Sequence, residues 1–218
     1  MMVDQHCKLC HAPVRIYTHA KLGRFYLCTG CEFIFKDRAF FLSEDEERQS
    51  YRRHNNSIED PRYVAFFYKF LDDAVFPYIG TGRQGFDFGS GPEPVLATLL
   101  EQNHGFQMNI YDIFYAPDKV YQGKKYDLIT ATEVVEHLGD PLHYFKRFAG
   151  LLKPDGVLAV MTLFHHNGIS HFNNWHYMRD RTHVSFYTPK TMRHIAEQSG
   201  LKVVHTDGIR YTTFMLDD

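Results

Sequence analysis

The sequence has no long hydrophobic run and almost no excess of charge of either sign. None of its apolar stretches approaches the roughly 18 residues that a membrane-spanning helix needs. The formal net charge of −2 over 218 residues gives no electrostatic reason to expect a nucleic-acid partner. The first six residues lack the basic and apolar regions of a secretory signal. We therefore expect a cytoplasmic protein without membrane contact, built from one main domain and an appendage.

Cysteine is scarce as well, and its few copies lie close together near the N-terminus. Two Cys-x-x-Cys pairs are separated by residues 11–27, which is a spacing typical of a four-cysteine zinc site. The four predicted ligands are Cys7, Cys10, Cys28 and Cys31. Disulfides or idle buried thiols are the alternatives, and a cytoplasmic location disfavours the first of these. His6 and His11 flank the first pair as substitute ligands. Apolar residues between the pairs predict a hairpin, so we expect a structural zinc ribbon over residues 1–42.

The main domain is organised around residues 86–96. Phe86 and Phe88 alternate with polar residues as in a short buried strand, and Gly89 and Gly91 then break the chain before an apolar helical run. A strand, a glycine turn and a helix form the nucleoside-binding corner of a doubly wound α/β sheet. Asp112 follows at the tip of the next predicted strand, where an acid can hold the hydroxyls of a ribose.

The same stretch disfavours a dinucleotide. Pro94 replaces the third glycine of the dinucleotide fingerprint, and Glu93 adds negative charge where a pyrophosphate would lie. A ligand with a ribose, a cationic group and no phosphate fits better. The stretch resembles the first signature motif of the class I S-adenosylmethionine-dependent methyltransferases, which implies a Rossmann-like sheet over residues 81–218. The expected cofactor-binding residues are Asp87, Phe88, Gly89, Ser90, Gly91, Asp112, Ile113, Phe114, Thr132 and Glu133.

The segment after Asp112 is short for this family. The common layout places a helix and a strand there, and the end of that strand usually contacts adenine. Residues 113–125 include Pro117 and Gly123 and can hardly hold both elements. We therefore expect an abbreviated sheet, with the adenine resting on Ile113 and Phe114.

Residues 126–163 resemble the fourth and fifth motifs of small-molecule methyltransferases. A strand is predicted over residues 126–131, with Thr132 and Glu133 at its tip, and Asp140 precedes a predicted helix. Residues 153–156 predict a turn, and residues 157–163 another buried strand. His137 is a candidate catalytic residue, although Glu136 and His137 could equally form a structural hydrogen-bonding pair.

Residues 165–187 predict a lid over the acceptor. Their histidines do not have metal-ligand spacing, so we expect Trp175, His176 and Tyr177 to shape an apolar acceptor wall instead. Thr182 and His183 match a Thr-His pair of the ubiquinone-pathway O-methyltransferases. The resemblance implies that His183 is the base, and a hydrogen bond that anchors the lid is its alternative role.

Helices are predicted on both sides of these motifs. Ser43 and Glu46 form a capping box that opens a helical linker and cap over residues 43–80. In this linker Tyr51 and His54 could reach over the cofactor, or they could merely line a helix junction. Thr188 caps a last helix, and strands over residues 202–206 and 211–216 should close the sheet with one antiparallel member.

Taken together, the sequence predicts methyl transfer from S-adenosylmethionine to a small molecule, with the acceptor atom (oxygen, nitrogen or carbon) left open. The zinc ribbon also resembles that of ribosomal-RNA methyltransferases, so RNA is an alternative acceptor, which the weak basic charge of the ribbon does not favour. A non-catalytic interaction protein that binds the cofactor is the alternative from another class. The sequence does not indicate an oligomeric state.

Overall fold

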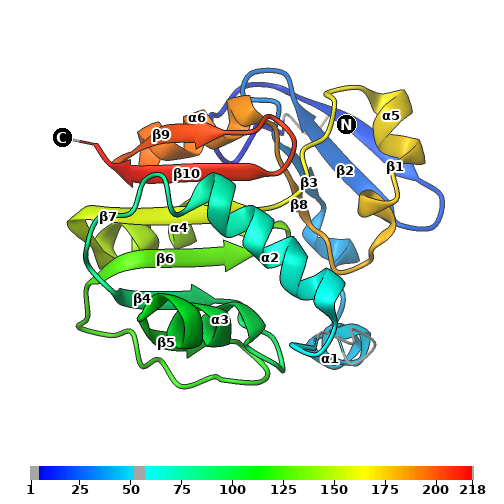
Figure 1. Ribbon diagram of the computed structural model, residues 1–218. Helices are drawn as coiled ribbons and strands as arrows, with labels where there is room; N and C mark the ends of the chain where they lie inside the picture. Colours follow the sequence, from blue (N-terminus) through cyan, green and yellow to red (C-terminus); the bar gives the residue numbers. More distant parts are fainter. Residues whose placement is uncertain (1–4, 52–56, 218) are drawn as a thin grey trace.

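The computed structural model describes residues 5–51 and 57–217, which form two sheets flanked by helices (Figure 1). The larger sheet has six strands in the order β5-β4-β6-β7-β10-β9. Their bounds are β4 Gln84–Phe88, β5 Gln107–Tyr111, β6 Tyr126–Thr132, β7 Leu152–Met161, β9 Leu201–Thr206 and β10 Tyr211–Leu216. β4 pairs in parallel with β5 and β6, and β6 with β7, whereas β10 runs antiparallel to both β7 and β9. The predicted single antiparallel member is therefore confirmed.

The sheet is shorter than the common layout, as predicted. Between the end of β5 and the start of β6 the chain forms turns and one isolated bridge, from Asp112 to Ala116, but no helix and no named strand. The predicted doubly wound, abbreviated α/β sheet is confirmed.

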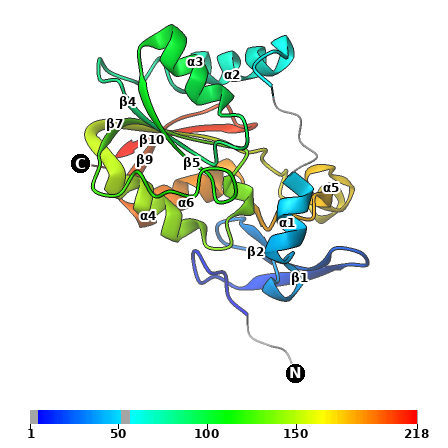
Figure 2. The same cartoon turned by 90° about the horizontal axis from the view of Figure 1, so that it is seen from below.

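Helices cover both faces of this sheet (Figure 2). Helices α2 (Pro61–Ala74) and α3 (Val95–His104) pack on one face, where β6 and β7 contribute Leu128 and Val157. Helices α4 (Pro141–Leu151) and α6 (Pro189–Ser199) pack on the other face against the intervening residues of these strands. Because both faces are buried, most residues of the central strands β6 and β7 are buried, as is usual for parallel sheets.

The smaller sheet joins the N-terminal ribbon to the lid. Its order is β1-β2-β3-β8, with bounds β1 Val14–His19, β2 Gly23–Cys28, β3 Ile34–Lys36 and β8 Ser185–Phe186. The β1–β2 pair is the hairpin that the sequence predicts. β8 was not predicted as a strand, and it comes from the lid segment, more than 140 residues after β3. The ribbon is thus joined through β3 to residues 185–186, which lie far along the chain.

The remaining short elements connect these layers. They are η1 (Arg38–Phe40), α1 (Glu44–Tyr51), η2 (Val135–His137), α5 (Ile169–Asn174) and η3 (Tyr177–Arg179). Asp60, Asp140 and Thr188 each accept a backbone N–H at a helix N-terminus, and the Ser43–Glu46 capping box forms. Among the described residues, no helix is both long and apolar enough to cross a membrane.

One local prediction is wrong. Residues 153–156 do not leave the sheet as a turn, because β7 runs through them from Leu152. The pairing with β6 jumps from Tyr126–Leu152 to Leu128–Val157, so residues 153–156 form an irregularity within β7 that is not paired with β6.

Candidate functional site

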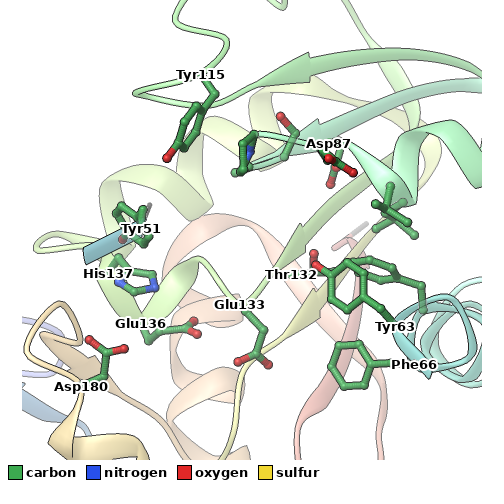
Figure 3. A pocket seen from close by; sticks show the side chains of 18 of the residues that line it. Tyr51, Tyr63, Phe66, Asp87, Tyr115, Thr132, Glu133, Glu136, His137 and Asp180 are labelled. Carbon is green, nitrogen blue, oxygen red and sulfur yellow. The ribbon is translucent and has the colours of Figure 1, made fainter. Parts of the chain in front are cut away.

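A cavity of about 410 Å³ opens where β4 and β6 end, at the carboxyl edge of the larger sheet (Figure 3). Residues from the glycine turn, the tip of β6, α1, α2 and the lid segment line it. Its size is within the usual range of small-molecule sites, and its place is the one where ligands bind in open α/β sheets.

The glycine turn after β4 forms one wall. Gly89 and Gly91 both have positive φ, at 81° and 69°, which side chains other than glycine rarely adopt. A Cβ on Gly89 would lie 2.4 Å from a methyl group of Val134, whereas a Cβ on Gly91 would meet nothing within 4 Å. The Ser90 hydroxyl is buried and has no hydrogen-bond partner among the described residues. The turn therefore offers bare backbone and one unused polar atom to a ligand.

Asp87 lies at the end of β4 in this wall and is almost completely buried. Its Oδ1 accepts a hydrogen bond of 2.6 Å from the Thr130 hydroxyl. Burial raises the pKa of Asp87 to about 6, which the Thr130 bond opposes and the negative charge of Asp112 reinforces.

Asp112 lies behind the glycine turn. Its Oδ2 accepts the Gly91 N–H at 3.1 Å, and its Oδ1 accepts the N–H groups of Phe114 and Tyr115. Asp112, Ile113 and Phe114 do not line the cavity in this structure. Ile113 is exposed, and the Phe114 ring packs against the Tyr51 ring with a distance of 5.7 Å between the ring centroids. Asp112 therefore fixes the shape of the turn, because its carboxylate oxygens are occupied by backbone amides.

Three further cofactor predictions fall at the ends of β4 and β6. Thr132 and Glu133, at the tip of β6, line the cavity as expected. Phe88 does not, since it is buried under the sheet against the rings of Tyr111 and Phe148.

Buried acids form the floor of the cavity (Figure 3). Glu136 is completely buried, and the Tyr177 hydroxyl donates a hydrogen bond to its Oε1 and lies 3.2 Å from Glu133 Oε2. Burial, reinforced by the charge of Glu133, raises the pKa of Glu136 well above its usual range. Burial also raises the pKa of Glu133, while Arg210 and Tyr177 oppose the shift. Oε1 of Glu133 and Oε2 of Glu136 have no partner among the described residues.

The two candidate catalytic histidines lie together beside this floor. The ring centroids of His137 and His183 are 4.8 Å apart. Each Nδ1 faces a backbone carbonyl: that of His137 lies 3.2 Å from Thr182 O, and that of His183 lies 2.7 Å from Tyr177 O. A carbonyl only accepts, so each Nδ1 carries a hydrogen and each neutral ring has its lone pair on Nε2. Asp180 Oδ2 lies 3.9 Å from His183 Nε2. Burial opposes ionisation of Asp180, but the Thr182 hydrogen bonds and the nearby His183 lower its pKa.

Within residues 5–51 and 57–217, two groups of side chains could hold a metal ion. One ligand atom from each of Glu136, His137 and His183 lies within 4.8 Å of the others, inside the cavity wall. The second group is the four cysteines, whose sulfur atoms lie as close together. Neighbouring sulfurs are 3.3–3.7 Å apart, too far for a disulfide and close to the roughly 3.8 Å that four sulfurs at 2.3 Å from one ion would have. His6 and His11 are not in this group.

The lid residues separate into two sets. His176 and Tyr177 line the cavity, as does Tyr51 from α1. Trp175 does not, because it is buried between lid and ribbon in a cluster with Phe25, Phe172 and Phe186. His54 lies outside the described residues.

Several lining residues are not among the site residues predicted from the sequence, and four of them bear on the chemistry of the cavity. Tyr63 and Phe66 come from α2, Tyr115 from the segment after β5, and Asp180 from the lid (Figure 3). Three of the four are aromatic, and their rings leave flat apolar walls around the acidic floor. Asp180 could have been predicted from its position three residues before His183, because an acid at that distance can reach the histidine.

Comparison with known proteins agrees with this architecture. The family described as "Methyltransferase domain" matches residues 58–206. The ubiquinone biosynthesis O-methyltransferase of Dinoroseobacter shibae is 30% identical over 139 residues, which cover 60% of this chain and 55% of that protein. The corresponding protein of Coxiella burnetii is 29% identical over 123 residues, which cover 51% of this chain and 53% of that protein. The chain thus spans about half the length of these curated relatives.

Solved structures share the fold. An O-methyltransferase family protein from Burkholderia thailandensis superposes with a TM-score of 0.57 at 13% identity, covering 79% of this chain and 63% of its own. An O-methyltransferase from neocarzinostatin biosynthesis, solved with S-adenosyl-L-homocysteine and 1,4-dihydroxy-2-naphthoic acid, has a TM-score of 0.50 at 14% identity, covering 73% of this chain and 60% of its own. With a family model matching most of its length, the chain belongs to the class I S-adenosylmethionine-dependent methyltransferases.

Proposed function

We propose that this chain transfers a methyl group from S-adenosylmethionine to a hydroxyl oxygen of a small, flat acceptor. The observation that carries the proposal is the cavity at the carboxyl edge of β4 and β6, which joins a bare glycine turn to a pair of histidines. The names of the matching relatives, ubiquinone biosynthesis O-methyltransferases, favour oxygen over nitrogen or carbon as the acceptor atom.

The residues at the glycine turn fit this cofactor. Gly91 leaves open space where a side chain would otherwise stand, and Ser90 offers a buried hydroxyl without a partner. Asp87, Glu93 and Glu133 line the same cavity, and their carboxyl groups favour a cationic ligand over a phosphate. When bound, S-adenosylmethionine supplies a methyl group on a positively charged sulfur, which is a good leaving group.

The acceptor side would exclude water and orient a planar molecule. Tyr51, Tyr63, Phe66 and Tyr115 offer aromatic walls, and such walls align a ring without fixing its identity. Burial raises the pKa of the fully buried Glu136 and of its partner Tyr177, which favours the neutral form of both groups. They can therefore position a hydroxyl group by hydrogen bonding.

We assign the base to His183. Its Nδ1 donates to the Tyr177 carbonyl, so Nε2 is the ring atom at which His183 would take the acceptor proton. Asp180, 3.9 Å from Nε2, would stabilise the imidazolium that forms. His137 lies beside it in the same orientation and is the second candidate.

We propose that the four cysteines hold one structural zinc ion. A set of four thiolates is closed, with no position left for a substrate, so this metal would support folding and not chemistry. Reduced cysteines in this arrangement also favour a cytoplasmic location.

A methyl-transfer assay tests the proposal and its alternatives. Methyl-labelled S-adenosylmethionine is offered with three acceptor pools: substituted catechols and phenols, a metabolite extract, and ribosomal RNA. The proposal predicts label in a phenolic product, and label in RNA alone would support the RNA alternative. Binding of the cofactor without label in any pool would support the non-catalytic alternative.

A further inference from the structure

The acceptor side of the cavity and the cysteine centre are connected through the smaller sheet. Cys28 ends β2, and its N–H donates to the Phe33 carbonyl at 2.9 Å, which closes the turn that carries Cys31. β3 begins three residues after Cys31 and pairs antiparallel with β2. The geometry of the four-cysteine turn therefore decides where β3 runs.

β3 in turn holds the lid segment. Ile34 pairs with Phe186 and Phe35 with Ser185, and the Lys36 N–H donates to the Val184 carbonyl at 2.9 Å. β8 pairs with no other named strand in the described chain, so β3 is its only neighbour in a sheet.

Lys36 adds a second attachment to the same segment. Although it is a lysine, its side chain is only 4% exposed, and its Nζ donates to the Arg181 carbonyl at 3.0 Å. Arg181 lies between Asp180 and His183, the acid and the histidine of the acceptor side. Burying a lysine side chain costs free energy unless its ammonium group is hydrogen-bonded. Here the bond to the Arg181 carbonyl anchors the turn that carries Asp180 and His183.

The segment meets the catalytic floor on its other side. The Val184 N–H donates to the Glu136 carbonyl at 2.9 Å, and the Tyr187 hydroxyl donates to the Val135 carbonyl at 2.7 Å. Residues 180–187 therefore lie between β3 and the η2 turn that carries Glu136 and His137.

Glu32 forms a separate bridge between the cysteine turn and the end of the lid. Its Oε2 accepts the Thr188 hydroxyl at 2.9 Å, and its carbonyl accepts His165 Nε2 at 3.0 Å. The Thr191 hydroxyl donates to the Cys31 carbonyl at 2.9 Å. The cofactor turn has a different support, since Gly89 bonds to Tyr111, Asp87 to Thr130 and Gly91 to Asp112, none of which belongs to the ribbon.

We propose that the four-cysteine centre positions the acceptor half of the site: when the cysteines hold their metal, β3 is ordered and keeps residues 180–187, with Asp180 and His183, against the catalytic floor. The cofactor half does not depend on the metal. Loss of the metal would thus abolish acceptor positioning while leaving cofactor binding intact. This inference rests on the proposed function, and Lys36 is its main positioning residue.

Hydrogen–deuterium exchange on the full chain tests the coupling without an acceptor. Removing the metal with a zinc chelator under reducing conditions should raise the exchange rate of amides 183–187 on the order of tenfold or more. Without β3 the segment loses its strand pairing and is no longer held against the η2 turn, where the Val184 N–H donates to the Glu136 carbonyl. Amides of β4 and β6 should keep their rates. Calorimetry with S-adenosylhomocysteine on the same sample should give a dissociation constant within about threefold of the untreated protein.

A milder variant covers the case in which metal loss unfolds the chain. Lys36→Met keeps the four cysteines and the apolar stem but removes the bond to Arg181, and Lys21→Met, at an exposed position of the ribbon hairpin, is the matched control. With histidines labelled by ¹⁵N, the imidazole signal assigned through His183→Gln should shift in Lys36→Met and not in Lys21→Met.

Two results would overturn the inference. One is unchanged protection of amides 183–187 after the metal has left, and the other is an unchanged His183 signal in Lys36→Met. If the untreated, folded protein fails to bind the cofactor, the proposed function fails instead, and the two failures are distinguishable.

Discussion

At the scale of single residues, the role of His183 follows from its tautomer. Its Nδ1 is held by the Tyr177 carbonyl, so substitution by glutamine removes the base but little of the packing. We expect His183→Gln to lower turnover by roughly 10²–10⁴-fold, the range for loss of a positioned base, with cofactor affinity nearly unchanged. The pH–rate profile of the wild type should fall on the acid side as the imidazole is protonated.

The same profile separates the base from a lid anchor. His183→Gln should lose the acid limb altogether if His183 is the base. A variant that keeps the limb and only raises the acceptor KM would give the role to His137 or His176 instead.

The raised pKa of Asp87 makes the free energy of unfolding depend on pH. Its pKa rises from 3.8 to about 6 on folding, so the native state binds the proton more tightly and this group destabilises the fold as pH rises through that window. Asp87→Asn can still accept the Thr130 hydrogen bond and should stabilise the free protein by about 1–3 kcal/mol at pH 7–8, with no gain below about pH 4. Thermal unfolding of both proteins over this range measures the difference. A variant that is less stable than the wild type at every pH would contradict the assignment of this cost to Asp87.

How far the sequence predicts the site differs from residue to residue. Glycines with positive φ and acids at strand tips carry local signals, and Gly91 and Glu133 indeed line the cavity. Asp112 has the expected place in the chain, but three backbone amides bind its carboxylate, which sequence spacing cannot reveal. Tyr63 reaches the cavity because α2 leans over the sheet edge, and its aromatic spacing alone indicates only a buried face.

At the scale of elements, two N-caps can be compared directly. Thr188 caps α6 in a capping box, is buried and also donates to Glu32, whereas Asp140 caps α4 at an exposed position. Thr188→Ala should therefore destabilise the fold by about 2 kcal/mol and Asp140→Ala by about 1 kcal/mol. Denaturant unfolding of the two variants tests the order. Equal losses would mean that the bridge to Glu32 contributes nothing.

Element prediction works where the signal is local and fails where it is not. Caps, helical periodicity and the short segment after Asp112 give the helices and the missing strand. Residues 153–156 are different, because proline and glycine predict a turn there, whereas β7 continues through the segment although the segment itself is not paired with β6. β8 is only two residues long and exists through β3, so no local pattern could have predicted it.

At the scale of the whole molecule, the ribbon should behave as a metalloprotein unit. We expect one zinc ion per chain in freshly purified, reduced protein, by elemental analysis. Cys10→Ser should lower metal content and melting temperature together, because a partial thiolate set binds the ion less tightly. Full metal-free stability of the wild type, with the cysteines reduced, would contradict a structural role for the ion.

The central claim is that the cavity at the edge of β4 and β6 is a cofactor site. It combines a glycine turn, buried acids and an open position at Gly91, and a cofactor there would meet acceptors held by the lid. Gly91→Leu is a direct probe, since its side chain would enter the open space while the left-handed backbone adds only local strain.

The most direct measurement is a calorimetric titration of the native protein with S-adenosylhomocysteine, run beside Gly91→Leu. The account predicts saturable binding at one site per chain, and at least tenfold weaker binding by a Gly91→Leu variant that still unfolds cooperatively. Absence of binding by native protein that melts cooperatively, or equal binding by the two proteins, would contradict it.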